Sequence, residues 1–222
     1  PMLYYYYNPE DPDGNNRFTN TNVSVIGGDP FDGSMILTDK MIREIPQLPV
    51  YPGTKVIDIG QNTTYDFATN KDTDFDYDEE LKIYRAKSFT AGNNCRLELC
   101  AGEFHLENFN ADTFLVIHVP VLEDGQYVKL MVQGNIRISN NLTIINDNDR
   151  MDSLLFYSYE GDISFAAAGD SQGTERQIGL AVAPKGTISL SNKFIWKGGT
   201  WAKKVIVQAR SEYHLLPEVD DE

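Results

Sequence analysis

From Val56 to Val132, hydrophobic and polar residues alternate in short runs, and Gly, Asn or Asp separates one run from the next. Alternation with a period of two places every second side chain on one face, which is typical of a β-strand with one buried side. The separating residues favour turns. The pattern predicts strands at residues 56–59, 81–84, 96–99, 103–106, 114–117 and 128–132.

A repeated plan follows in the C-terminal part of the chain, where a turn residue precedes alternating apolar positions. Equivalent positions are 27 residues apart from Ile136 to Ile163, 25 from Ile163 to Ile188 and 17 from Ile188 to Val205. Repeats of roughly 20 to 30 residues are typical of stacked layers that bury their apolar sides against one another. We therefore predict an all-β fold, a short right-handed parallel β-helix (a solenoid). Further strands are predicted within the repeats, at 153–157 and 178–182.

An antiparallel sandwich or jelly roll is the competing fold, because it also joins many short strands by turns. The repeats lack the Asn-Gly and Asp-Gly pairs that form tight hairpins, which favours the solenoid. Asn tolerates left-handed backbone angles, so Asn residues are expected at the corners of the layers. The residues concerned are Asn140, Asn141, Asn146 and Asn192.

The pattern divides the chain into three segments. Residues 1–45 are rich in turn residues and are expected to form an irregular extension that packs on the solenoid. Residues 46–216 are assigned to the β-helix domain, and residues 217–222 to an acidic tail.

Helix is expected to be scarce. At most one short helix is predicted, at residues 38–44, where apolar residues fall near helical spacing before Pro46. The acidic segment 69–80 lacks the central Gly and the terminal Glu spacing of an EF-hand. We interpret it as an exposed loop rather than a calcium site.

The formal net charge of −14 argues against nucleic acid as a partner. Phosphate binding depends on clustered Lys and Arg, whereas the 19 basic residues are scattered. No apolar run approaches the roughly 20 residues that span a bilayer, so we predict no membrane insertion. Because the chain opens with Pro1 and shows no signal-peptide pattern, we expect a mature or trimmed fragment of a longer protein. It is expected to be a monomer or part of a larger modular protein.

Cys95 and Cys100 are the two cysteines of the chain. A local disulfide between them would fit an oxidising compartment, and two buried free thiols are the alternative. A zinc site would also need His ligands, and His105 and His118 lack a recognised spacing, so no metal site is predicted.

Carboxylates crowd one turn, where Asp147, Asp149 and Asp152 lie beside Arg150. A polysaccharide lyase or glycosidase would use such carboxylates, alone or with Ca²⁺. Carboxylates in turns also bind their own backbone, which explains the cluster without catalysis. These three residues form an alternative catalytic set, and no cofactor other than Ca²⁺ is considered. No nucleophile elbow or nucleotide-binding glycine motif is present in the sequence.

Four aromatic residues are candidates for ligand binding, because rings on a flat face stack on sugar rings. They are Tyr157, Tyr159, Trp196 and Trp201. Trp196 shares its parity with Phe194, so core packing is the alternative for that residue. Trp201 stands at a predicted strand start and is expected to be exposed.

Six segments occur in the order and spacing of a known family. They are LPVYPG at 48–53, CAGEF at 100–104, GNIRIS at 134–139, LLFYS at 154–158, AVAPKGTISL at 181–190 and WAKKV at 201–205. Together they resemble the β-helical domain of bacterial secreted and surface proteins called choice-of-anchor A. The resemblance implies a β-helix and an extracellular or cell-surface location, and no catalytic motif comes with it.

These observations predict a non-catalytic extracellular or cell-surface module for adhesion. Its expected partner is a polysaccharide or another cell-surface component. Two alternatives remain, a polysaccharide-cleaving enzyme on a β-helix and a purely structural spacer of a large surface protein.

Overall fold

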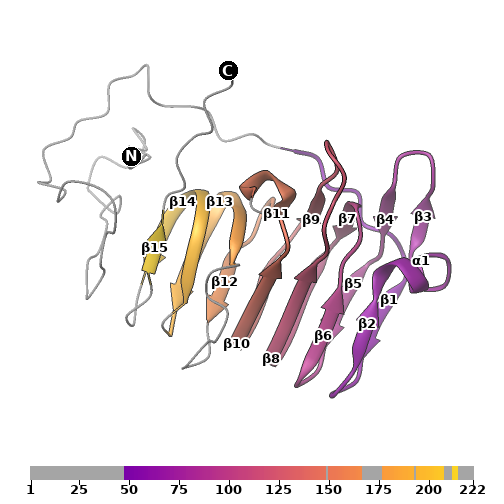
Figure 1. The fold of residues 1–222 in the computed structure, drawn as a ribbon, viewed down its shortest axis with the longest axis horizontal. Helices are drawn as coiled ribbons and strands as arrows, with labels where there is room; N and C mark the ends of the chain where they lie inside the picture. The colour runs from indigo at the N-terminus through magenta and orange to yellow at the C-terminus, as the bar shows by residue number, and fades with distance from the viewer. Residues whose placement is uncertain (1–47, 149, 167–176, 193, 208–211, 215–222) are drawn as a thin grey trace, which may run out of the picture.

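The computed structural model describes residues 48–148, 150–166, 177–192, 194–207 and 212–214 (Figure 1). These residues form one large, mostly parallel β-sheet and one α-helix, which confirms the all-β class. The proposed extension at 1–45, its helix at 38–44 and the acidic tail at 217–222 lie outside the described residues.

The elements follow one another in this order: β1 (Val56–Ile59), β2 (Thr64–Asp66), α1 (Phe67–Asp74), β3 (Asp76–Asp78), β4 (Ile83–Arg85), β5 (Ser88–Ala91), β6 (Cys95–Glu98), β7 (Gly102–Leu106), β8 (Asn108–Val119), β9 (Val128–Val132), β10 (Ile136–Asn146), the 3₁₀ helix η2 (Met151–Ser153), β11 (Leu154–Ser158), β12 (Ile163–Ala166), β13 (Ile178–Ser191), β14 (Ile195–Val207) and β15 (Glu212–His214).

Strand pairing among the described residues is parallel except between β3 and β4. The predicted registers are confirmed, since Ile163 lies opposite both Ile136 and Ile188, and Ile188 lies opposite Val205. An antiparallel sandwich or jelly roll requires the opposite strand direction. The pairing therefore argues against that alternative.

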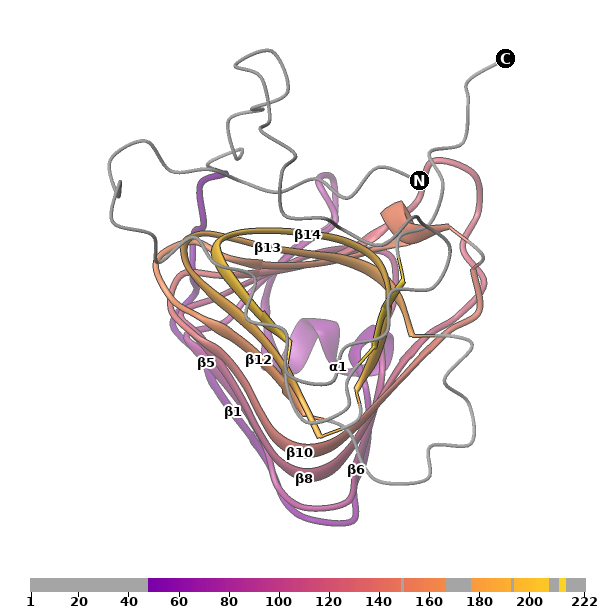
Figure 2. The same ribbon diagram turned by 90° about the vertical axis from the view of Figure 1, so that its left-hand side faces the viewer.

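The sheet consists of three ladders. The first ladder contains β1, β5, β12, the first parts of β8 and β10, and the last parts of β13 and β14. The second contains β2, β6 and the last parts of β8 and β10. The third contains β3, β4, β7, β9, β11, β15 and the first parts of β13 and β14. Viewed along the long axis, the ribbon follows a roughly triangular outline (Figure 2).

The core lies on the inner side of the ladders, where equivalent positions repeat from strand to strand. Phe89 and Phe109 are adjacent in register, and their rings stack 5.4 Å apart with 7° between the planes. Burial of each such side chain stabilises the fold by roughly 1.5–3 kcal/mol. The column that contains them is Ile57, Phe89, Phe109, Ile136, Ile163, Ile188.

The close approach of neighbouring repeats explains why glycine stands at their first position. A Cβ on Gly186 would lie 1.9 Å from the carbonyl oxygen of Gly161, and one on Gly161 would lie 2.6 Å from that of Gly134. Successive layers thus approach too closely for any side chain at this position.

The helix α1 lies at the β1–β3 end of the sheet (Figure 1). Its N-cap is Asp66, whose carboxylate accepts hydrogen bonds from the backbone N–H groups of Ala68 (2.8 Å) and Thr69 (3.2 Å). Phe67 and Phe75 at its two ends are buried against core aromatics. The interpretation of 69–80 as a loop is therefore wrong for its first part, because a capping carboxylate and two anchoring rings make a helix there. It is also wrong for β3, which pairs with β4.

The corner between the first and second ladders has a left-handed backbone. Asn141 and Asn192 have φ of 58° and 57°, as predicted for corner Asn residues. Asn140 directly precedes Asn141 at this corner and accepts a hydrogen bond from Asn192 (3.1 Å), but it lacks the left-handed backbone. The prediction is wrong for Asn146, which lies at the end of β10 and has no left-handed backbone. Asn146 ends β10 with a buried side chain that donates to the oxygens of Ser153 and Ile178, and this explains why an Asn stands there.

No helix in the described part of the chain is long and apolar enough to cross a bilayer.

Candidate functional site

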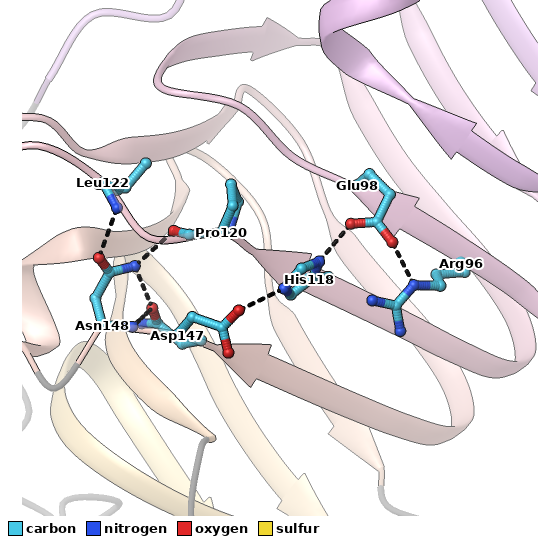
Figure 3. A network of polar contacts seen from close by, with 8 residues as sticks. Arg96, Glu98, His118, Pro120, Leu122, Asp147 and Asn148 are labelled. Atoms are coloured by element: carbon cyan, nitrogen blue, oxygen red, sulfur yellow. Dashed lines mark hydrogen bonds and ion pairs between the residues drawn. The ribbon is translucent and has the colours of Figure 1, made fainter.

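A charged network lies on the outer side of the second ladder, near the end of its strands (Figure 3). His118 of β8 stands opposite Glu98 of β6 in register. Asp147 directly follows β10, and its backbone N–H donates to the carbonyl oxygen of Val119 (3.0 Å). Three neighbouring strands thereby bring together one imidazole and two carboxylates.

The imidazole of His118 is bound on both sides. Its Nδ1 contacts Oε2 of Glu98, and its Nε2 lies 2.8 Å from Oδ2 of Asp147. The other oxygen of Glu98 accepts a hydrogen bond from Nε of Arg96. The His118 side chain is 19% exposed, so it is partly shielded from solvent.

The network favours ionised side chains. Burial alone would lower the pKa of His118, but hydrogen bonds to Asp147 and Glu98 together with their charges raise it above its ordinary value. For Glu98, burial alone would raise the pKa. Hydrogen bonds from His118 and Arg96 outweigh this effect, so the pKa of Glu98 lies below its ordinary value. Only a protonated imidazole donates from both nitrogens, so the network holds His118 as a cation.

Two buried amides position the backbone beside Asp147. The side-chain oxygen of Asn148 accepts from the backbone N–H of Leu122 (2.9 Å), and its nitrogen donates to the carbonyl oxygen of Pro120 (2.9 Å). The same nitrogen donates to the side chain of Asn146 (2.9 Å). The connection after β8 is therefore fixed to the end of β10.

The protonation of His118 limits the reactions in which this network could take part. A general base needs a free lone pair, and both nitrogens of His118 are engaged with carboxylates. In the part of the chain that the structure describes, no group of three or more His, Cys, Asp or Glu side chains is arranged to hold a metal ion. The arrangement acts as a fixed ionic clamp across three strands.

Two members of the alternative catalytic set lie in the described residues, and each has a different partner. Asp147 binds His118, whereas the side chain of Asp152 is 72% exposed and lies 3.5 Å from Nε of Arg150. Asp149 lies outside the described residues.

A second polar group lies on the outer side of the third ladder. His105 is buried, and its Nδ1 accepts a hydrogen bond from the backbone N–H of Tyr51 (3.1 Å). Glu103 accepts from Lys129 (2.8 Å) and lies 3.3 Å from Nε2 of His105. Burial lowers the pKa of His105 and outweighs the effect of Glu103, so this imidazole is held neutral, in contrast to His118.

Two of the four candidate aromatics are buried, which corrects their prediction as ligand-binding residues. Trp196 points inward and packs on Phe156, Phe165 and Phe194, as its parity allows. Tyr157 occupies an outward position, but it is buried with Met131 and Val182 beneath residues 48–50. Its hydroxyl accepts a hydrogen bond from the backbone N–H of Leu48 (2.7 Å).

The other two aromatics reach the surface. Trp201 stands opposite Val182 in register and is 40% exposed. Two atoms at the edge of its ring lie 3.5 Å from the position that a Cβ would take on Gly199, so the indole leans toward that glycine. Tyr159 is half-buried, packs against the cluster that contains Val182, and has Nζ of Lys185 3.9 Å from its ring centre.

The predicted disulfide is absent, because Cys95 and Cys100 are free thiols. Cys95 points into the core and donates to the carbonyl oxygen of Gly60 (3.1 Å). Cys100 lies beyond the end of β6 and donates to the hydroxyl of Tyr84 (3.3 Å). The two side chains thus have separate partners on different parts of the sheet.

Sequence reasoning missed Glu98 and considered His118 only as a zinc ligand. A signal was present, because the two residues are 20 positions apart, the same separation as Phe89 and Phe109. Extending the periodicity from the C-terminal repeats to this region would have placed both on one outward row.

No family model, curated protein or solved structure matches this chain. The resemblance to choice-of-anchor A domains therefore stays a prediction.

Proposed function

We propose that this chain is a non-catalytic module of an extracellular or cell-surface protein that binds polysaccharide. In this proposal the three ladders are the sides of a right-handed parallel β-helix, and the third ladder presents the binding face. The alternative of a polysaccharide-cleaving enzyme is not favoured, since His118 and Asp147 are engaged with each other.

The observation that carries the proposal is the position of Trp201. The edge of its ring lies beside Gly199, which has no side chain, and the residue remains 40% exposed. The exposed part of an aromatic ring offers its negative π surface to the polarised C–H groups of a sugar. Tyr159, which packs against the cluster that contains Val182, extends the same region of the third ladder.

A second exposed aromatic residue, Tyr51, lies at the other end of the third ladder's outer face. Tyr51 is 60% exposed and stacks on His105, with 6.1 Å between ring centres. His105 and Trp201 occupy the same outward row, four strands apart. At about 4.8 Å per strand, His105 and Trp201 are ~19 Å apart. Residues 48–50 pack on the row between them, so the two exposed rings stand at its opposite ends. Such a separation suits an extended polymer better than a single sugar.

The test is retention on insoluble cellulose, xylan and chitin, with the native protein compared with Trp201→Ala. We expect the native chain to be retained by at least one glycan and Trp201→Ala to bind it about tenfold more weakly. Leu81→Ala is the matched control, because Leu81 is also a large exposed apolar residue but lies in the turn between β3 and β4. Lack of retention on every glycan would refute the proposal.

A further inference from the structure

Phe114 is the one large hydrophobic residue among those with a left-handed backbone in the described chain. Its φ is 62°, and its side chain is 56% exposed. A bulky residue in this conformation is strained, and a ring that is mostly exposed returns little burial energy to the fold. Folding therefore gives no reason for a phenylalanine here.

The neighbouring positions show what the fold itself prefers. Asn62, Asn94 and Asn141 have φ of 59°, 56° and 58° at the same corner. The adjoining registers place Asn94 and Asn141 on either side of Phe114, because Leu115 lies opposite both Cys95 and Leu142. The side chain of Asn94 also donates to that of Asn62 (2.8 Å). Phe114 thus interrupts a column of asparagines.

The surroundings of the ring are polar. Asn93 accepts a hydrogen bond from the backbone N–H of Thr113 (3.1 Å), and Asn94 donates through its backbone to the carbonyl oxygen of Thr113 (2.9 Å). The side chains of Asn62, Asn94 and Asn140 are exposed. From Asn62 to Asn141 the column spans three strand spacings, ~14 Å. A single apolar ring is flanked along the axis by amide groups.

We propose that this column is a second carbohydrate-contact site, in which Phe114 stacks on a sugar ring and the flanking amides of Asn94 and Asn141 bind its hydroxyl groups. This inference rests on the proposed polysaccharide function and extends it to another side of the molecule. Amides both donate and accept hydrogen bonds, as neighbouring hydroxyls require, and the ring supplies the apolar platform. A hydrophobic protein partner would leave these amides without matching groups.

The test compares Phe114→Asn, which completes the asparagine column, with Phe114→Tyr, which keeps the ring and the strain. We expect Phe114→Asn to raise the thermal midpoint by about 2–4 °C, because Asn adopts this backbone readily. We also expect it to weaken binding about tenfold to the glycan that retains the native protein. Phe114→Tyr is expected to keep both the midpoint and the affinity of the native chain.

The outcomes separate the two proposals. Native affinity in Phe114→Asn, together with weakened binding in Trp201→Ala, would overturn the second site and leave the proposed function standing. Absence of glycan retention by the native protein would refute the proposed function itself. If Phe114→Asn abolished only self-association, measured by analytical ultracentrifugation, the occupant would be a second copy of the chain and the carbohydrate site would be overturned.

Discussion

Two carboxylates from different parts of the sheet stabilise the protonated imidazole of His118. Glu98 lies in β6, and Asp147 directly follows β10. Neither neighbour in sequence contributes, since Glu98 and Asp147 are 20 and 29 residues away. The pKa of His118 is raised in the folded chain, so protonation and folding favour each other.

The sign of this coupling predicts a pH dependence. His118 stabilises the fold fully below its unfolded pKa of about 6.5, and the contribution is lost as the pH rises through the raised folded value. We expect His118→Gln to lower the free energy of unfolding at pH 6 by about 2 kcal/mol and by clearly less at pH 9. Urea unfolding at the two pH values measures this. Equal losses at both would contradict the charged clamp, and Asp152→Asn serves as a control carboxylate outside it.

The corner residues and the charged network around His118 could be predicted from the sequence to different extents. The Asn residues at 141 and 192 were predictable, because few residue types tolerate a positive φ. Phe114 at the same corner was not, because its residue type argues against that backbone. The clamp was hidden because its members lie in separate strands and only the correct register brings them together.

At the scale of the element, α1 depends on its N-cap. Asp66 satisfies two backbone donors at the start of the helix, and the anchored rings of Phe67 and Phe75 join the helix to the core. The sequence pattern did not reveal this helix, because its residues show no apolar stripe and the burial falls on the two ends.

Removal of the cap gives an element-scale prediction. We expect Asp66→Ala to lower the free energy of unfolding by about 1 kcal/mol, because two backbone N–H groups lose their acceptor. Asp66→Asn keeps an acceptor oxygen and should retain most of the stability. Asp72→Ala, on the same helix but away from the cap, is expected to change stability by less than about 0.5 kcal/mol. A loss in Asp72→Ala equal to that in Asp66→Ala would exclude the capping explanation.

At the scale of the whole molecule, the parallel registers hold the described chain together without a covalent link. The repeats at Ile136, Ile163 and Ile188 predicted these registers correctly, because burial on one face fixes a strand to within one residue. The spacing of Cys95 and Cys100 did not reveal that both are free thiols. Cys95 faces the core, whereas Cys100 follows the end of its strand.

Free thiols lead to a prediction for the intact protein. We expect a reducing agent to leave the thermal midpoint unchanged, because no cross-link constrains the unfolded chain. Under denaturing conditions without reductant, alkylation should label both cysteines, as mass spectrometry would show. A protein that takes up label only after reduction would contain the bond that the structure lacks.

The close contact of Gly134, Gly161 and Gly186 bears on how such a chain can grow in evolution. Residues 136–162 supply one strand to each ladder and end where the next equivalent stretch begins, with Ile136 opposite Ile163. A tandem duplication of this stretch would carry its own glycine and its own strands. The molecule would lengthen by one strand spacing, about 4.8 Å, while both ends keep their present neighbours.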